Sequence, residues 1–156
     1  MQYNNAFKNN SHFHGIQNVH HVPSSKRILV VPAESDHTII LDDSGKELCK
    51  LYPARAQSSL IREMDVKTGP HDHASADSRT ALIVYDTIYL NGRDLYAYCA
   101  SDHTIGICKE KNSFGGKRIK YDMINKIIFS NLLHLKLCWS EKYKVLCSVA
   151  SNNNIY

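Results

Sequence analysis

The sequence lacks the features that place a protein in a membrane, in the secretory pathway or among small disulfide-bonded proteins. No apolar stretch approaches the roughly 18 residues that a membrane-spanning helix needs. The first ten residues are polar and rich in asparagine, without the apolar segment of a signal peptide. The five cysteines are scattered, odd in number and free of any CxxC pair, which favours a reduced, intracellular setting. We therefore expect a cytoplasmic protein that does not bind membranes.

Neither sign of charge is concentrated along the chain. Lysine and arginine number 19 against 15 aspartates and glutamates, a net charge of +4, and no run of five or six like charges occurs. Nucleic-acid binding is therefore not indicated. The hydrophobic fraction of 43% and the charged fraction of 22% are those of an ordinary globular protein, and 156 residues suffice for one domain.

The common catalytic motifs are also missing. There is no GxSxG, HExxH or EF-hand sequence, and no nucleophile has a recognisable base beside it. The segment Gly115-Gly116-Lys117 is not a phosphate-binding loop, because the Walker pattern requires glycine where Lys111 stands and serine or threonine where Arg118 stands. We expect no catalytic activity and no cofactor.

The most metal-like cluster is His71-Asp72-His73, because imidazole and carboxylate groups suit zinc. It offers at most three ligands in a small, polar segment, and no second histidine pair lies nearby in the sequence. An exposed loop is the favoured interpretation. The alternative function is an enzyme or metal-binding protein that uses His71 and His73, or another face of the fold.

The main positive feature is an internal repeat. The residues Ser-Asp-His-Thr-Ile stand at 35–39 and again at 101–105, and a degenerate copy, Ser-Asn-Asn-Asn-Ile, stands at 151–155. Each copy follows a short apolar run and opens another, which is typical of a β-hairpin. Three such hairpins in one chain indicate a repeat architecture.

The turns of these hairpins contain Asp36, Asp102 and Asn152. A carboxylate at this position can accept hydrogen bonds from backbone N–H groups of the turn and hold the hairpin closed. A catalytic role would need two carboxylates converging on one substrate, whereas equivalent turns lie on separate sheets. We therefore predict that these three residues are structural.

The apolar runs between the turns predict four short antiparallel strands per repeat, joined as a meander. Residues 122–130 fit a loop or one helical turn, and Cys99 and Cys108 are expected to pack as small apolar side chains rather than to pair across a hairpin. The predicted organisation is a flexible leader (1–13), a first unit (14–52), an inserted loop (53–80), a second unit (81–121) and an incomplete third unit (128–156).

The hairpin pattern resembles the WD40 family of β-propellers, whose repeats contain an aromatic–serine pair, a turn, Asp-x-Thr-Ile and then Trp-Asp. The third repeat fits best, with Trp139-Ser140 before its turn and Asn152-x-Asn154-Ile155 after it. The family's Trp-Asp pair is replaced by Asp42-Asp43 and Cys108-Lys109 in the other two repeats, and its Gly-His pair is absent. The hydrogen-bonded tetrad of that family therefore cannot be complete here.

The resemblance implies an all-β fold of antiparallel four-stranded sheets, arranged as about two and a half blades of a propeller. It also implies a non-catalytic scaffold for protein partners, with the inserted loop as the first place to seek a contact. Similarly divergent blades occur in large WD-repeat proteins associated with cilia. A standalone small β-sandwich is the alternative fold. Because propeller sheets bury their faces against each other, we expect the chain to need the rest of a propeller or self-association to complete its fold.

Overall fold

The computed structural model of the chain describes residues 15–53, 82–90, 94–111, 120–129 and 131–156. The predicted leader, almost all of the inserted loop and the histidines of the His71–His73 cluster lie outside these described residues.

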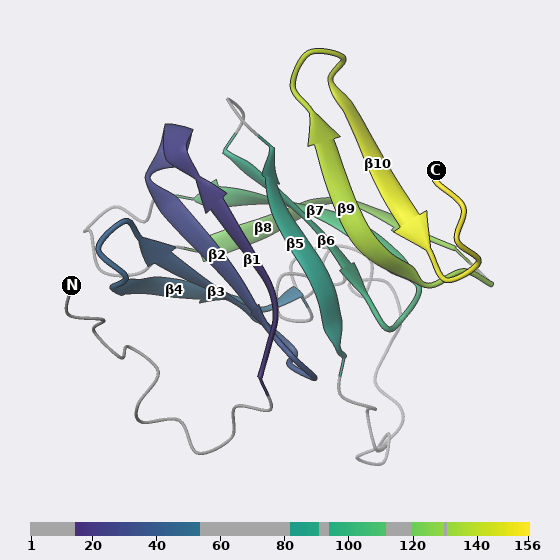
Figure 1. Cartoon of the computed structure of the whole chain (residues 1–156), viewed down its shortest axis with the longest axis horizontal. Helices are drawn as coiled ribbons and strands as arrows, with labels where there is room; N and C mark the ends of the chain where they lie inside the picture. Colours follow the sequence, from purple (N-terminus) through teal and green to yellow (C-terminus); the bar gives the residue numbers. More distant parts are fainter. Residues whose placement is uncertain (1–14, 54–81, 91–93, 112–119, 130) are drawn as a thin grey trace, which may run out of the picture.

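The described residues form ten strands in three antiparallel sheets that follow one another along the chain (Figure 1). The first sheet contains β1 (Ile16–Val22), β2 (Arg27–Pro32), β3 (Thr38–Asp42) and β4 (Glu47–Leu51), with a short 3-10 turn, Pro23–Ser25, between β1 and β2. The second contains β5 (Val84–Leu90), β6 (Leu95–Ala100), β7 (Thr104–Lys111) and β8 (Lys120–Ile128). The third contains β9 (His134–Ser140) and β10 (Val145–Ala150).

The order of strands confirms the predicted meander. Each four-stranded sheet pairs its strands in sequence order, β1 to β4 and β5 to β8. Three sheets in succession differ from the two facing sheets of a β-sandwich, the alternative fold. The described part of the chain contains no helix that is long and apolar enough to cross a membrane.

One element was predicted wrongly. Residues 122–130 were expected to form a loop or a helical turn, but β8 runs through Ile128 and pairs with β7 along its whole length. The second sheet therefore extends beyond the predicted end at residue 121. The segment Met123 to Ile128 mixes apolar and polar residues without strict alternation, because an outer strand is only partly covered by neighbours.

Two apolar clusters hold the three sheets together. The cluster between the first and second sheets includes Leu29, Val31, Ile40, Tyr96 and Tyr98, all of which are fully buried. The cluster between the second and third sheets includes Ile88, Ala97, Cys99, Ile105 and Leu137. Strands β5, β6 and β7 thus turn one set of side chains to each neighbouring sheet, as the two-residue period of a strand requires.

The first strand of each sheet carries a bulge at the same place. Ile16, Val84 and His134 are equivalent because they pair with Pro32, Ala100 and Ala150, and in each strand the next paired residue lies two positions further on. A bulge adds one unpaired residue and turns the strand locally. Its recurrence shows the internal repeat in the backbone, independently of the turn sequences.

The hairpins that carry the two identical turn sequences nevertheless differ by one residue in their strand pairing. Leu29 pairs with Ile40, eleven positions along the chain, whereas its equivalent Ala97 pairs with Ile107, ten positions along. A shift of one residue moves a side chain to the opposite face of a sheet. Thr38 therefore faces the second sheet, where its hydroxyl lies 2.7 Å from that of Thr87, whereas in the other copy Ile105 faces the following sheet.

Strand pairing also places the cysteines. Cys99 lies opposite Ile105 and Cys108 opposite Tyr96, so these two thiols do not face each other. Both are buried, as expected of cysteines that act as small apolar side chains. Burial raises the pKa of both thiols to about 12. Cys138 differs from the expectation for cysteines in apolar runs, because it is exposed.

Candidate functional site

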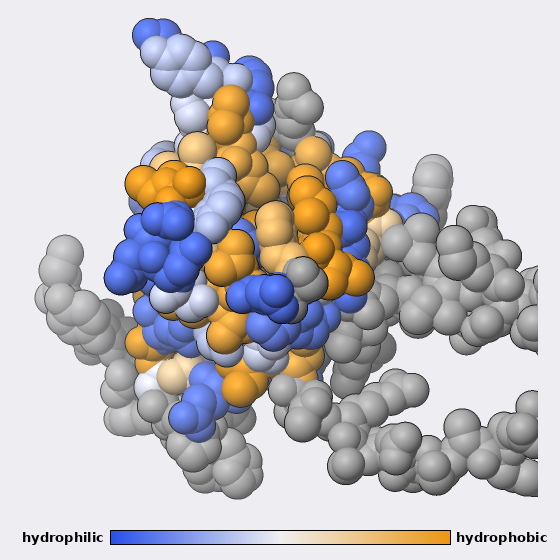
Figure 2. Space-filling view, turned by 90° about the vertical axis from the view of Figure 1, so that its right-hand side faces the viewer, coloured by the Kyte–Doolittle hydropathy of each residue, from blue (hydrophilic) through white to orange (hydrophobic). Residues whose placement is uncertain are grey.

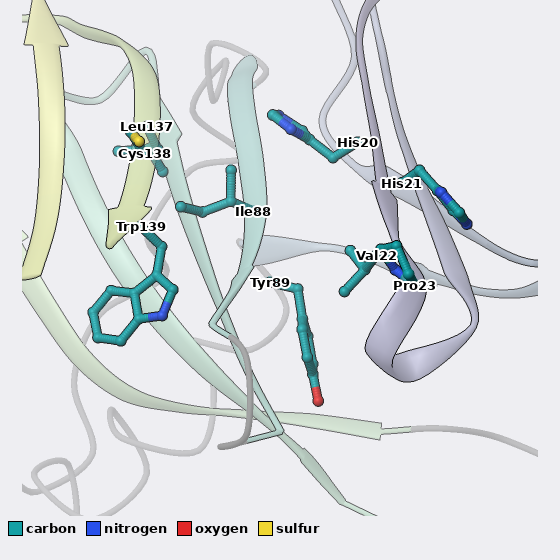
Figure 3. A pocket seen from close by; sticks show the side chains of 9 residues that line it. All are labelled: His20, His21, Val22, Pro23, Ile88, Tyr89, Leu137, Cys138 and Trp139. Atoms are coloured by element: carbon teal, nitrogen blue, oxygen red, sulfur yellow. The ribbon is translucent and has the colours of Figure 1, made fainter. Parts of the chain in front are cut away.

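The first strands of the three sheets, β1, β5 and β9, lie side by side and are called the inner strands here (Figure 1). They surround a pocket of about 320 Å³ (Figure 3). Its lining comes from all three inner strands and from the turn after β1: His20, His21, Val22, Pro23, Ile88, Tyr89, Leu137, Cys138 and Trp139. The pocket therefore requires all three sheets, because no single sheet forms it.

Three of the lining residues occupy the same position in their strands. His21, Tyr89 and Trp139 are equivalent, since they lie opposite Ile28, Tyr96 and Leu146 in their sheets. Figure 3 shows the rings of Tyr89 and Trp139 beside the space between the inner strands, whereas the ring of His21 points away from that space on the other side of β1. The repeat thus places one aromatic ring on each inner strand.

Each of these rings is held by an acidic residue. His21 Nε2 lies 3.4 Å from a carboxylate oxygen of Asp43, the Tyr89 hydroxyl donates to Asp94 at 3.0 Å, and Trp139 Nε1 donates to Glu141 at 2.7 Å. We call Asp43, Asp94 and Glu141 the rim acids. Glu141 also forms an ion pair with Lys144, but among the described residues neither Asp43 nor Asp94 pairs with a lysine or arginine. The rim acids therefore lie next to the aromatic rings, although none of the three lines the pocket itself.

A buried carboxylate, Asp86, ties the three inner strands together. Its Oδ1 accepts hydrogen bonds from Asn18 Nδ2 at 2.5 Å and from the backbone N–H of Thr87 at 2.9 Å, and lies 2.9 Å from His20 Nε2. Its Oδ2 accepts from the backbone N–H of Leu137 at 2.9 Å. Asp86 stands on β5, His20 on β1 and Leu137 on β9, so one side chain links all three sheets behind the pocket.

The Asp86 carboxylate stays ionised although it is fully buried. Burial alone would raise its pKa, but hydrogen bonds from His20, from the Leu137 N–H and from Asn18 outweigh that effect and hold the pKa below its usual value. This arrangement is typical of a structural anion. Its oxygens are already occupied by donors, so the carboxylate is not free to act on a bound molecule.

The predicted turn residues lie at the ends of the hairpins, away from the pocket. The Asn152 Oδ1 accepts from the backbone N–H of Asn154 at 3.1 Å. The carboxylates of Asp36 and Asp102 instead contact side chains: Asp36 contacts His37, and Asp102 contacts Thr104 at 2.5 Å and Lys126 at 3.3 Å. Asp102 thus contacts β8 through Lys126, whereas the Asp36 contact stays within its own turn.

Two important polar residues were not predicted from the sequence. His134 is buried, its Nδ1 lies 2.8 Å from the Ser148 hydroxyl, and burial lowers its pKa. Its position just before an apolar run was a usable signal. Asp86 interrupts the run Leu82 to Leu90, and an isolated acid in such a run was the signal that it is buried and bonded.

In the described part of the chain, no group of three or more histidine, cysteine, aspartate or glutamate side chains is arranged to hold a metal ion. The His71–His73 alternative lies outside that part. The candidate site is thus an apolar and aromatic pocket between the three inner strands, with acidic residues beside its rings.

No known protein family matches the chain, and no curated protein is similar to it in sequence. Among solved structures, the β-propeller domain of Cps50 (Swd1) from Myceliophteria thermophila is similar, with a TM-score of 0.54 and 12% sequence identity. The match covers 90% of this chain and 38% of that one, so the chain spans well under half the length of the propeller domain that it resembles. At this identity the similarity shows the fold alone, that of a β-propeller, as the turn sequences predicted.

Proposed function

We propose that this chain, with the fold of WD40-type propeller blades, is a non-catalytic scaffold for protein–protein contacts. The observation that carries the proposal is the pocket between the inner strands, beside which Tyr89 and Trp139 place their rings. Aromatic side chains with one polar end are enriched at protein contacts, because they bury a large apolar area and still form a hydrogen bond.

The partner that best fits the pocket is a protein segment carrying an arginine or lysine beside an apolar residue. A cation over an aromatic ring is attracted by the ring. Asp43 and Asp94, which form no ion pair with a lysine or arginine among the described residues, add charge complementarity beside the rings. The rings are held by hydrogen bonds before any partner arrives, so little ordering entropy is lost on binding.

We further propose a cytoplasmic location, and association with a cilium is a narrower form of this proposal that rests on the divergent blades alone. All five cysteines are free thiols, as is usual where glutathione keeps cysteines reduced.

Trp139 provides a test, because it is the only tryptophan in the chain and lines the pocket. Short peptides with an arginine or lysine beside a leucine should change its fluorescence, and the same peptides with glutamate in place of the cation should not. Tyr89→Ala and Asp94→Asn should each weaken binding, the first by about fivefold or more, since an aromatic residue at a contact contributes over about 1 kcal/mol.

The matched control is Tyr143→Ala, which removes an aromatic ring that is 69% exposed and does not line the pocket. This variant should bind like the parent chain. Equal responses to basic and acidic peptides, or equal losses in Tyr143→Ala and Tyr89→Ala, would contradict the proposed site.

A further inference from the structure

Two cysteines of the third sheet lie directly opposite each other. Cys138 on β9 pairs with Cys147 on β10, so both side chains leave the same face of the sheet. They lie nine residues apart in the sequence with no recognised motif, and only the strand register brings them together. No other two cysteines pair across described strands.

The backbone sets the spacing of this pair. Ser148 and Tyr156 exchange both backbone hydrogen bonds, so the N–H and C=O groups of Ser148 point away from β9. Neighbouring positions alternate, which makes Cys147 and Cys138 a hydrogen-bonded pair, with Cα atoms about 5.5 Å apart. This Cα–Cα distance is within the range found in disulfides. The Cβ atoms of such a pair lie slightly further apart than those of a disulfide, so they must move closer for the bond to form.

The face that carries the two thiols is open. We call it the open face and define it by Cys138, Val145, Cys147 and Val149. Val145 is 47% and Val149 38% exposed, and Cys138 is exposed as well. Figure 2 shows this side of the molecule, with apolar side chains gathered between hydrophilic ones. The equivalent residues of the second sheet, Ile88 and Ala97, are buried against the third sheet.

A positive charge lies beside the thiols. Lys136 is two positions before Cys138 on β9 and opposite Val149, so its side chain leaves the sheet on the open face. Lys136 is exposed and forms no ion pair with a described residue. A cation at this place suits a small disulfide that carries carboxylates, such as oxidised glutathione.

We propose that Cys138 and Cys147 form a reversible redox site, a cross-strand dithiol that small-molecule disulfides oxidise to an intramolecular disulfide. Exposed or slightly strained disulfides are the ones that are readily reduced again, so the bond is expected to respond to the glutathione balance rather than to be permanent. Cys99 and Cys108 are excluded from this chemistry, because they are buried and face other residues.

The reaction is a thiol–disulfide exchange in two steps. The thiolate of one cysteine attacks a sulfur of oxidised glutathione, which forms a mixed disulfide and releases one glutathione thiolate. The thiolate of the second cysteine then attacks the protein sulfur of the mixed disulfide and releases the second glutathione. Two protein thiols become one disulfide, oxidised glutathione is reduced to two glutathione molecules, and these take up the two thiol protons.

Peptide mapping of the folded chain after incubation with oxidised glutathione, in dilute solution, tests the proposal. Trypsin separates the two cysteines, because Lys136, Lys142 and Lys144 place them in the peptides 137–142 and 145–156. The expected result is that these two peptides are found cross-linked and that excess reduced glutathione separates them. In Cys147→Ser, Cys138 should stop at the mixed disulfide with glutathione, whereas Cys49→Ser, the matched control, should form the cross-link like the parent chain.

Two results would overturn the proposal. One is separate glutathionylation of Cys138 and Cys147 without a cross-link in the folded chain. The other is a cross-link that forms only in urea, which would show that the folded sheet keeps the thiols apart. The readout needs no partner and no peptide ligand, so it is independent of the proposed scaffold function.

Discussion

At the scale of single residues, Asp86 contributes most directly to holding the inner strands in place. One buried carboxylate receives donors from all three inner strands, and removing its charge leaves those donors without an adequate acceptor. An apolar contact at the same place would tolerate sliding of the strands, whereas four directed bonds fix their mutual position.

Asp86→Asn is therefore expected to lower the free energy of unfolding by about 1–3 kcal/mol, because the asparagine amide turns an N–H₂ group towards donors. Asp36→Asn is the control, since Asp36 is exposed, and it should change stability by less than about 0.5 kcal/mol. Urea denaturation measures both. Equal losses in the two variants would show that Asp86 is not specially bonded.

The same carboxylate predicts a dependence on pH. The folded-state pKa of Asp86 is lowered, so its contribution to stability is complete above its unfolded value of about 3.9 and is lost as the pH falls through the folded value. The stability difference between the parent chain and Asp86→Asn should be constant from about pH 5 upwards and should shrink below about pH 4. Urea denaturation at several pH values measures it, and a difference that grows in acid would contradict the assignment.

At the scale of elements, the packing of β6 against β7 depends on a single glycine. Gly106 lies opposite Tyr98, and a Cβ atom at residue 106 would stand 2.4 Å from the Tyr98 ring. Tyr98 is fully buried and its hydroxyl contacts Met123 Sδ at 3.8 Å, so a shift of the ring would disturb the packing of the core. The absence of a side chain at 106 is thus what admits a tyrosine to the core between the first two sheets.

Gly106→Ala is expected to destabilise the chain by about 1–3 kcal/mol through overpacking, measured by thermal or urea denaturation. Replacing the ring with a smaller side chain should relieve the clash, so Gly106→Ala in a Tyr98→Leu background should cost clearly less than in the parent. Identical costs in the two backgrounds would show that the ring does not limit residue 106.

At the scale of the whole molecule, a mostly buried ion pair joins the first two sheets. The Arg27 guanidinium on β2 binds both carboxylate oxygens of Glu110 on β7, and the Tyr96 hydroxyl donates to the same carboxylate at 3.2 Å. The Arg27 and Glu110 side chains are 19% and 10% exposed. Such a pair fixes how one sheet sits on the next, because its geometry admits only one arrangement.

Arg27→Met is expected to cost about 3–5 kcal/mol, since it leaves the Glu110 carboxylate buried without its partner. The double variant Arg27→Met/Glu110→Leu should recover most of that loss, because two packed apolar side chains need no partner. Chemical denaturation of the single and double variants measures the difference. Additive losses would show that the two charges do not act as a pair.

For the whole molecule we also predict that the chain self-associates. The open face exposes apolar side chains that the equivalent positions of the second sheet bury, and exposed apolar faces favour association. Sedimentation velocity should show association that increases with concentration, and Val149→Lys should weaken it. A compact monomer at every concentration would remove this expectation.

The sequence alone was sufficient for the class of fold. Turn residues recurring after apolar runs predicted hairpins, and the alternation within those runs predicted strands, since both signals depend on local chemistry. The four-stranded meanders and the propeller fold follow from them. The outer strand of the second sheet was predicted to end at residue 121, although β8 runs to Ile128, because an outer strand has few buried positions and therefore a weak pattern.

Only the tertiary structure decided which residues meet. The one-residue difference between the first two hairpins is invisible when the matching turn letters are aligned, yet it sends Thr38 and Thr104 to opposite faces. The link between Asp86 and His20 spans 66 residues, and the Cys138–Cys147 pair depends on strand register. Side-chain patterns report which face is apolar, but register and the packing of separate sheets determine which polar groups come within bonding distance.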